Sequence, residues 1–191
     1  MLVGIFGGSF NPIHTGHLRL ARALVHQGLL DEIWLMVSPL NPLKQGQTDI
    51  LDDEARLAMV QLATANEPHI QACDLEMHMP RPSYMVRTLE TLRKNYPQHE
   101  FVLVIGSDNW QRFPQWRESD EILRHHKLLV YPRPGYELYA TTLPQGVTLV
   151  NTPLYDISST DIRHRIAQGN YHGRGLSRCV WQEIRKKGYY K

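Results

Sequence analysis

The chain has 191 residues, 42% of them hydrophobic and 21% charged, which is the composition of an ordinary globular domain. Its 21 basic and 19 acidic residues give a net charge of +2, so charge does not indicate a nucleic-acid or membrane partner. No apolar run reaches the roughly 20 residues of a membrane span, and residues 1–6 lack the basic segment of a signal peptide. Because the two cysteines stand far apart, we expect a reducing, cytoplasmic location.

Strand and helix patterns alternate along the first half of the chain. The predicted strands are short apolar runs at residues 1–6, 32–37 and 69–73. The predicted helices, with apolar residues at helical spacing, are residues 15–27, 53–65 and 83–95. Gly28 is placed to end the first helix, and Asp52 or Asp53 to cap the second. The proline-rich and glycine-containing residues 38–52 predict a loop.

The same alternation continues to the end of the chain. The predicted strands are residues 100–105, 127–131 and 147–150, and the predicted helices are residues 117–124, 159–168 and 177–187. Ser107 or Asp108 is expected to cap a short helix, Trp110 to lie in the core, and residues 185–187 to form a solvated helix end. The pattern favours one α/β domain over residues 1–191. Its expected form is Rossmann-like and doubly wound, with a mainly parallel sheet of about six strands and helices on both faces.

Three marked segments follow predicted strands, at residues 7–17, 106–116 and 157–163. In a doubly wound sheet, ligands bind at the carboxyl ends of the strands, near the point where the strand order reverses. The sequence therefore predicts that these three segments surround one site.

The first segment, GGSFNPIHTGHL, carries two histidines at the start of a helix. Gly7 and Gly8 let a ligand approach the backbone, and Ser9 offers a hydroxyl group. His14 and His17 stand three residues apart, where free N–H groups and the helix dipole attract anions. We expect both imidazoles to face one phosphate and to stabilise charge on it. By itself, this spacing also fits a turn with two surface histidines, whereas a zinc site lacks a third ligand nearby.

The last segment, DISSTDIR, predicts another helix start at residues 156–163. Ser158, Ser159 and Thr160 bring hydroxyl groups to free N–H groups, and Arg163 follows one turn later. This set suits the β- and γ-phosphates of a nucleotide. A plain serine cap with a surface arginine is the alternative for this segment alone.

Together, these two segments resemble the motifs of the HxGH nucleotidyltransferase superfamily. PSYMVRTLETLR (82–93), IGSDNWQRFPQWRESDEIL (105–123) and RPGY (133–136) further resemble motifs of the bacterial nicotinate mononucleotide adenylyltransferases, in that family's order. The resemblance extends over almost the whole chain. It implies that ATP and nicotinate mononucleotide form deamido-NAD and pyrophosphate, a step in NAD biosynthesis. The mononucleotide phosphate would attack the α-phosphorus of ATP directly, without a covalent enzyme intermediate.

The resemblance also implies the residues of an ATP site. His14 and His17 would be catalytic, with His17 at the α-phosphate, Lys44 over the triphosphate and Asp108 on a ribose hydroxyl. The full set of implied ATP-binding residues is Gly7, Gly8, Ser9, Phe10, His14, His17, Lys44, Ile105, Gly106, Asp108, Ile157, Ser158, Ser159, Thr160 and Arg163. Residues from about 157 to 191 would complete this site. Mg²⁺ would arrive with ATP, so no protein metal ligand is expected.

For the mononucleotide, the resemblance implies a second set of residues. They are Ser9, Lys44, Tyr84, Met85, Val86, Trp116, Arg117 and Arg133. Trp116 would stack on the pyridine ring, and Arg133 would bind the mononucleotide phosphate. Backbone N–H groups at residues 84–86 and at Arg117 would favour a carboxylate over a carboxamide. Met85 stands where the family commonly has threonine.

Four alternatives remain at this stage. A phosphopantetheine adenylyltransferase shares the histidine and ISST motifs but does not account for PSYMVRTL or Trp116. Nicotinamide mononucleotide is an alternative substrate of the same chemistry. A non-catalytic nucleotide sensor on this fold would lack turnover. An NAD-dependent oxidoreductase is disfavoured because no GxGxxG motif is present. A homo-oligomer is compatible with the sequence.

Overall fold

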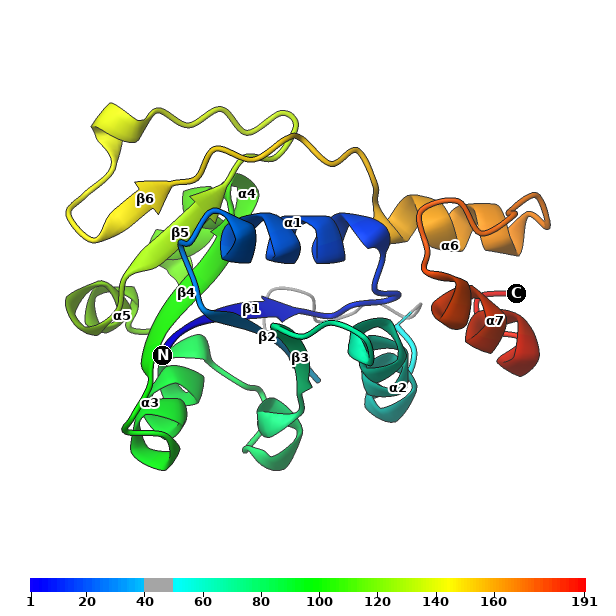
Figure 1. Ribbon diagram of the computed structural model, residues 1–191, viewed down its shortest axis with the longest axis horizontal. Coiled ribbons are helices and arrows are strands. Elements are labelled where there is room, and N and C mark those ends of the chain that lie inside the picture. Colours follow the sequence, from blue (N-terminus) through cyan, green and yellow to red (C-terminus); the bar gives the residue numbers. More distant parts are fainter. Residues whose placement is uncertain (40–49) are drawn as a thin grey trace.

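The computed structural model describes residues 1–39 and 50–191, so Lys44 lies outside the described residues. Within them, six parallel strands form one sheet in the order β3-β2-β1-β4-β5-β6. The strands are β1 (Leu2–Gly8), β2 (Glu32–Val37), β3 (Ile70–Cys73), β4 (Glu100–Gly106), β5 (Leu128–Tyr131) and β6 (Val147–Leu149). The order reverses between the central strands β1 and β4 (Figure 1). This arrangement confirms the predicted doubly wound α/β fold.

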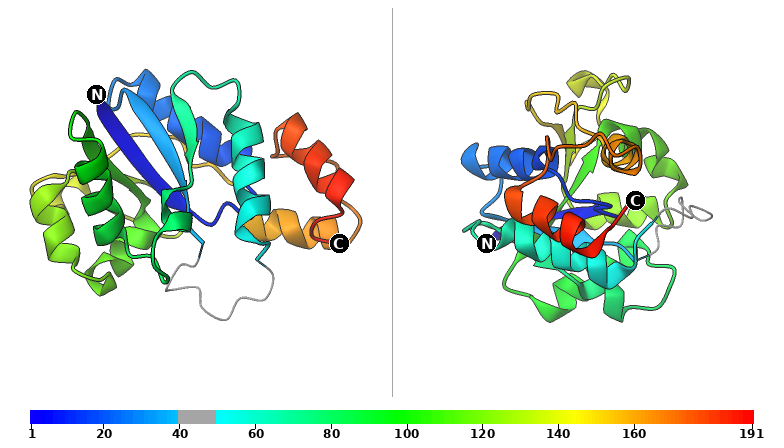
Figure 2. Two further views of the ribbon diagram at one scale, coloured as in Figure 1. Left: turned by 90° about the horizontal axis from the view of Figure 1, so that it is seen from below. Right: turned by 90° about the vertical axis from the view of Figure 1, so that its right-hand side faces the viewer.

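Helices cover both faces of the sheet. On one face lie α1 (Thr15–His26) and α2 (Asp53–Thr64), and α6 (Ser159–Ala167) and α7 (Arg178–Lys187) contribute to the same core from one end of the molecule. Those on the other face are α3 (Met85–Asn95), α4 (Ser107–Arg112) and α5 (Ser119–His125). The 3-10 helices are η2 (Leu75–His78), η3 (Phe113–Gln115) and η4 (Ala140–Thr142). Figure 2 shows α6 and α7 beside α2, at one end of the molecule.

Strand β4 shows why the sheet needs helices on both sides. Phe101, Leu103 and Ile105 pack into the core on the side of α3, whereas Val102 and Val104 pack into the core on the side of α1. A strand that is buried on both faces is apolar at every position, as in a sheet of parallel strands. The unbroken apolar run in the sequence therefore has a direct structural cause.

Two helices begin two residues later than predicted. Helix α5 begins at Ser119 rather than Arg117, because Glu118 before it adopts the left-handed conformation with φ of 53°. Helix α3 begins at Met85 rather than Ser83, and the Ser83 hydroxyl instead donates a hydrogen bond to Glu76. The other helix and strand boundaries agree with the predicted ones to within one or two residues.

The segment after β4 corrects two further predictions. The N-cap of α4 is Gly106, not Ser107 or Asp108, and the Ser107 hydroxyl accepts a hydrogen bond from the Arg133 backbone N–H at 2.9 Å. Trp110 is only partly buried and stacks on Phe113, which is the buried aromatic residue of this segment. By contrast, Asp52 is confirmed as the cap of α2, since its carboxylate accepts from the Ala55 N–H.

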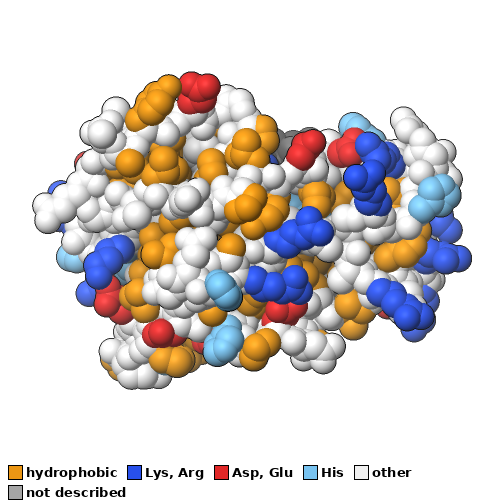
Figure 3. All heavy atoms as spheres, turned by 45° about the horizontal axis from the view of Figure 1, so that its top comes forward, with side chains coloured by type: hydrophobic (Ala, Val, Ile, Leu, Met, Phe, Trp, Pro, Cys, Tyr) orange, Lys and Arg blue, Asp and Glu red, His pale blue; other side chains and the backbone are white. Residues whose placement is uncertain are grey.

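Charged side chains are distributed unevenly over the surface. Figure 3 shows Lys and Arg side chains gathered toward the right-hand end of the face in view, the end at which Figure 1 draws α6 and α7. Residues 185–187 in the last turn of α7 are exposed, as predicted for a solvated helix end. No described helix has the length and apolar character required to cross a bilayer. Cys73 and Cys179 are both free thiols.

Candidate active site

The three predicted segments converge on one cavity at the carboxyl ends of β1 and β4. This main cavity has a volume of about 280 Å³. Its lining includes Gly7, Gly8, Ser9, Phe10, Asn11, His14, His17, Asp108, Asn109, Arg112, Tyr131, Arg133, Ile157, Ser158, Ser159, Thr160 and Arg163. The residues come from the β1–α1 segment, from α4, from the end of β5 and the residues after it, and from the start of α6. The structure therefore brings together the segments that the sequence marks.

Two stacked histidines begin helix α1. His14 is the N-cap and His17 the third residue of the helix, and their ring centroids lie 3.6 Å apart at an interplanar angle of 17°. The backbone N–H of His14 donates to Nδ1 of His17 at 3.2 Å. A neutral imidazole that accepts at Nδ1 carries its proton at Nε2. His17 is thus fixed as an Nε2–H donor by its own helix start.

His14 has a strongly altered protonation equilibrium. Burial, together with the positive charge of Arg133, lowers the pKa of His14 to about 3. Its side chain is therefore neutral at physiological pH, whereas an exposed histidine would be partly charged. Its Nδ1 atom is buried and has no hydrogen-bond partner among the described residues. The pair thus offers hydrogen-bonding nitrogen atoms without adding a buried positive charge.

The two glycines of the β1–α1 loop have packing partners inside the protein. A Cβ atom at Gly8 would lie 3.0 Å from the Phe10 ring, and one at Gly7 would lie 3.1 Å from the Met85 methyl group. Phe10 is buried, with φ of 45°, and its ring meets that of His17 edge-on at 5.0 Å. Gly8 therefore leaves room for the Phe10 ring, which contacts His17, whereas Gly7 leaves room for Met85, and both glycines line the cavity.

Residues from the start of α6 hold this loop in place. Arg163 donates from Nη1 to the Asn11 carbonyl at 2.9 Å, and Ser159 donates to the Pro12 carbonyl at 2.9 Å. Ser158 caps α6, because its hydroxyl accepts from the Asp161 N–H. Ser158, Ser159 and Arg163, three of the four side chains predicted for phosphate binding, thus line the cavity and also make structural contacts.

A buried arginine that the sequence analysis missed anchors the same loop from the other side. Arg56 on α2 has no exposed surface. Its guanidinium donates to the carbonyls of Ser9 at 2.6 Å, Ser38 at 2.9 Å and Leu51 at 3.0 Å, and it pairs with Asp53. Arg56 therefore joins the β1–α1 loop to the residues that precede and follow 40–49.

Asp108 and Arg133 face each other at the edge of the main cavity. Arg133 Nε lies 3.8 Å from Asp108 Oδ1, too far for a hydrogen bond. This oxygen is buried and accepts no hydrogen bond from the described residues. A Cβ atom at Gly106 would come within 2.3 Å of it, so the glycine is needed for this placement. Asp108 keeps an acceptor ready for a hydroxyl group of a ligand.

A smaller cavity lies next to the main one. This inner cavity, of about 80 Å³, is lined by Gly7, Gly8, Ser38, Glu76, Met85, Ile105, Gly106, Asn109, Trp116 and Tyr131, among others. The Trp116 indole nitrogen is buried and donates no hydrogen bond to the described residues. Since Gly7, Gly8, Asn109 and Tyr131 line both cavities, the two form one continuous site.

The residues predicted for the mononucleotide are only partly brought together. Met85 and Trp116 line the inner cavity, and Arg133 lines the main one. Val86 is buried in the core, and the Arg117 guanidinium lies 4.8 Å from the centre of the Tyr84 ring. Tyr84, Val86 and Arg117 line neither the main cavity nor the inner one, so the role expected of their N–H groups stays a prediction.

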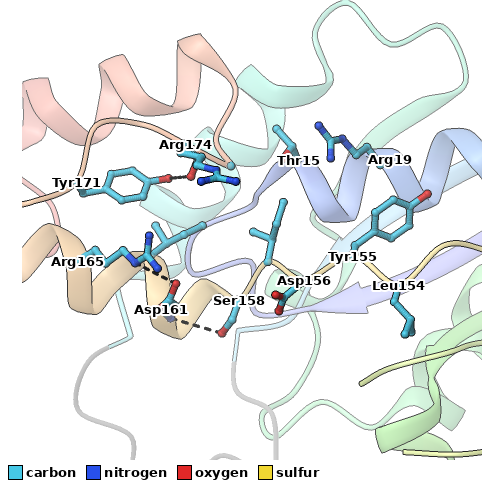
Figure 4. Close-up of a pocket in the computed structure, with 13 residues that line it drawn as sticks. Thr15, Arg19, Leu154, Tyr155, Asp156, Ser158, Asp161, Arg165, Tyr171 and Arg174 are labelled. Carbon is cyan, nitrogen blue, oxygen red and sulfur yellow. Dashed lines mark hydrogen bonds and ion pairs between the residues drawn. The ribbon is translucent and has the colours of Figure 1, made fainter. Parts of the chain in front are cut away.

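A third and larger cavity lies outside this site. It has a volume of about 540 Å³ and lies between α1 and α6, where Figure 4 shows Arg19 and Arg174 on two sides of it. Thr15 and Arg19 line it from the face of α1 opposite to His14 and His17. The larger cavity shares only Ile157 and Ser158 with the main cavity. Cavity size alone would therefore have pointed away from the histidine pair.

Metal ligands are not clustered in the part of the chain that the structure describes. Residues 1–39 and 50–191 contain no group of three or more His, Cys, Asp or Glu side chains with the arrangement of a metal site. Any divalent cation at the histidine pair would depend on oxygen atoms of a ligand.

Comparisons with known proteins agree with this geometry. Residues 5–165 match the cytidylyltransferase-like family. A protein of Bacteroides thetaiotaomicron, named probable nicotinate-nucleotide adenylyltransferase, is 48% identical over 183 residues, which are 96% of this chain and 90% of that protein. A protein of the same name from Bacteroides fragilis is 51% identical over 181 residues, 95% of this chain and 90% of its own length.

Solved structures show the same fold. The structure described as Plasmodium falciparum nicotinic acid mononucleotide adenylyltransferase complexed with NaAD has a TM-score of 0.83 at 21% identity, and the match covers 98% of this chain and 96% of that chain. A structure described as a putative nicotinate-nucleotide adenylyltransferase from Vibrio parahaemolyticus has a TM-score of 0.72 at 22% identity, with 100% and 96% covered. At these identities the likeness concerns the fold.

Proposed function

Since the chain is a member of the cytidylyltransferase-like family and, within it, of the nicotinate-nucleotide adenylyltransferases, we propose that it transfers the adenylyl group of ATP to nicotinate mononucleotide. The products are deamido-NAD and pyrophosphate, in a step of NAD biosynthesis. The observation that carries the proposal is the stacked pair of His14 and His17 at the start of α1, in a cavity that the three marked segments line together.

The chemistry needs positioning and charge stabilisation more than acid–base catalysis. The attacking mononucleotide phosphate is already an anion at neutral pH, so no side chain has to remove a proton from it. In our proposal, His17 donates from Nε2 to the α-phosphate, where negative charge accumulates in the transition state. His14 is neutral because of its low pKa, and it packs against His17 and fixes its orientation. Arg163 holds the loop that presents both rings.

The two cavities divide the substrates between them. ATP occupies the main cavity, with its ribose on Asp108 and its phosphates at the N-terminus of α1 and on residues 158–163. Residues 157–191 complete this subsite, an assignment supported by the bonds from α6 to the loop. Mg²⁺ enters with ATP and is held by phosphate oxygens and water. Lys44 is the basic residue that we propose to contact the triphosphate.

The pyridine ring occupies the inner cavity against Trp116, which lines it. Arg133 binds the mononucleotide phosphate from the main cavity. The N–H groups at the start of α3, around Met85, and at Arg117 bind the nicotinate carboxylate. We further propose that the protein acts in the cytoplasm, with ATP and nicotinate mononucleotide as its partners and with neither nucleic acid nor membrane.

A paired assay tests the proposal. Purified protein, ATP and Mg²⁺ are incubated with nicotinate mononucleotide in one reaction and nicotinamide mononucleotide in the other, and dinucleotide and pyrophosphate are both measured. We expect equal amounts of the two products and a preference for the acid. Equal use of both mononucleotides would overturn the carboxylate assignment while keeping adenylyl transfer. Turnover of phosphopantetheine alone, or ATP binding without any product, would overturn the proposal.

A further inference from the structure

The inner cavity contains a buried carboxylate that adenylyl transfer does not use. Glu76 follows strand β3 on η2, is 2% exposed, and lines the inner cavity together with Met85 and Trp116. Glutamate side chains are rarely buried to this extent unless a positive charge lies beside them. The surroundings of Glu76 therefore indicate what this cavity binds.

The hydrogen-bond partners of Glu76 are both neutral. Ser83 donates to Oε2 at 2.9 Å, and Thr88 donates to Oε1 at 2.8 Å. Among the described residues, none of the ion pairs involves Glu76. Its carboxylate is thus solvated by two hydroxyl groups while its charge has no counter-charge in the described part of the protein. A buried charge in this condition is costly, so a ligand that supplies the opposite charge would be bound favourably.

Two other titratable groups near this carboxylate add no charge of their own. Burial raises the pKa of the Cys73 thiol, and the negative charges of Asp74 and Glu76 add to that rise. Burial also raises the pKa of Tyr131, which lines the same cavity, to about 12, although the positive charge of Arg133 acts in the opposite direction. Both groups are therefore neutral at physiological pH, and Arg133 lines the main cavity rather than the inner one.

We propose that Glu76 provides the counter-charge for the pyridinium ring of the mononucleotide, and that it makes the protein select the oxidised ring over the uncharged dihydropyridine form. This inference rests on the proposed function. The ring nitrogen that carries the ribose is quaternary, so an oxidised pyridine mononucleotide has a fixed positive charge. Trp116 presents an aromatic face to the same ring, which adds a cation–π interaction.

The substrate ring also has a negative charge, on the nicotinate carboxylate. In the proposed function this carboxylate binds the N–H groups at the start of α3, between Ser83 and Thr88, so Glu76 lies near the negative as well as the positive end of the ring. These two residues are the hydroxyl donors of Glu76. The carboxylate of Glu76 therefore also fixes the helix start, so that an experiment has to separate its charge from its structural contacts.

The effect of the Glu76 charge can be separated from that of its structural contacts by a change in the charge of the substrate ring. We compare two substrates: the oxidised mononucleotide that turns over in the paired assay, and its dihydropyridine form. Both are assayed with wild type and with Glu76→Gln, at constant ATP and Mg²⁺. We expect wild type to favour the oxidised ring by at least about tenfold in kcat/KM. In Glu76→Gln, kcat/KM for the oxidised ring should fall about tenfold while that for the reduced ring and KM for ATP stay within about twofold, as for a close charge pair.

Thr88→Val is the matched control, because it removes a hydroxyl donor from Glu76 and keeps the charge. We expect it to lower kcat/KM for both ring forms by the same factor. If Glu76→Gln also lowers both forms equally, or leaves the preference of wild type unchanged, the counter-charge role is wrong and Glu76 only positions the helix.

Calorimetric titration without ATP tests the inference separately from the proposed function. Selective binding of the oxidised ring that Glu76→Gln abolishes would support it even if no dinucleotide forms. Equal affinity of wild type for the two ring forms would overturn it, whatever the assay of turnover shows. Circular dichroism melting curves of each variant establish that the compared proteins are folded.

Discussion

At the start of α1, two imidazoles lie in contact but in different environments. His17 accepts from the His14 backbone through Nδ1, whereas the Nδ1 atom of His14 is buried and has no hydrogen-bond partner in the described part of the chain. The capping position of one histidine thus fixes the tautomer of the other. The first turn of the helix thereby produces a donor of defined orientation from residues that the sequence alone shows only as an HxxH spacing.

Replacement of His17 by alanine removes that donor. We expect kcat to fall about 10²- to 10³-fold, the usual cost of losing one donor to a charged transition state. The melting temperature should change little, because His17 is only partly buried. Initial rates of dinucleotide formation measure the effect. His26→Ala, at the exposed far end of the same helix, is the control and should keep wild-type activity. A His17→Ala enzyme within twofold of wild type would refute the assigned role.

The low pKa of His14 makes a prediction about stability. Because burial lowers this pKa from 6.5 to about 3 in the folded state, the unfolded chain binds the proton more readily below pH 6.5. The contribution of buried, neutral His14 to the free energy of unfolding is therefore complete above pH 6.5. It decreases as the pH falls toward 3, by about 1.4 kcal/mol per pH unit.

Urea denaturation of wild type and His14→Asn at pH 7.5 and pH 5 checks this sign. Between these pH values, wild type should lose about 2 kcal/mol of unfolding free energy relative to the variant, because the variant lacks the titrating group. Other titrating groups are common to both proteins and cancel in the difference. A difference that does not change with pH would contradict a lowered pKa for His14.

Single residues also mark the limits of what the sequence predicts. The histidines, the glycines and Asp108 could be predicted because each is local to a loop that follows a strand. Arg56 and Glu76 could not, since their roles arise from partners distant in the chain, such as Ser9. The sequence did contain one sign of the role of Arg56, because this residue belongs to the buried stripe of α2 with Met59, Val60 and Ala63. A charged residue in such a stripe predicts a buried polar contact.

At the scale of elements, α2 works as a support for loops. Arg56 binds four loop carbonyls and Asp53, whereas Arg81 binds the other oxygen of the Asp53 carboxylate from the exposed side. The two arginines share one carboxylate but differ in burial: 0% of the Arg56 side chain and 54% of the Arg81 side chain is exposed. The Arg56–Asp53 and Arg81–Asp53 contacts therefore allow a buried ion pair to be compared with an exposed one.

We expect Arg56→Ala to lower the free energy of unfolding by about 3–5 kcal/mol, because it leaves buried carbonyls and a carboxylate without their donor. Arg81→Ala should cost less than about 1 kcal/mol, since solvent screens the exposed pair. Denaturant unfolding of both variants measures the two costs. Similar losses for the two would show that Arg56 does not hold the loops together.

Most elements were predictable from periodicity, because β1, β2, β4 and β5 are buried on both faces and each long helix has one apolar stripe. The starts of α3 and α5 were not, since they depend on Glu118 in a left-handed conformation and on the bond between Ser83 and Glu76. Neither feature has a pattern in the local sequence. Tertiary contacts decide helix ends, whereas patterning decides which helices and strands exist.

On the scale of the whole molecule, the site joins residues from distant parts of the chain. Tyr190 donates from its hydroxyl to Asn11 Oδ1 at 2.9 Å, and the same oxygen accepts from the Leu51 N–H at 3.3 Å. Asn11 thus connects the β1–α1 loop to the region after α7. The sequence predicted that residues 157–191 contribute to the ATP site, and this link gives that proposal a specific contact.

Tyr190→Phe tests whether the link matters for substrate. The loss of one hydrogen bond of about 0.5–1.5 kcal/mol should raise KM for ATP about two- to tenfold, while KM for the mononucleotide stays unchanged. Tyr139→Phe is the matched control, because among the described residues that exposed hydroxyl bonds only to neighbouring Glu137. Steady-state kinetics with each substrate varied in turn give both constants, and an unchanged KM for ATP would exclude the link from substrate binding.

The contacts that hold the β1–α1 loop can form only late in the synthesis of the chain. Residues 7–17 are synthesised first, yet Arg163 and Tyr190, which bind the loop at Asn11, are synthesised near the end. Strand β1 likewise cannot form hydrogen bonds along its second edge until β4 has been synthesised. A growing chain therefore contains the histidine motif long before it can form an ATP site. Incomplete translation products would carry the motif without capturing nucleotide in the cell.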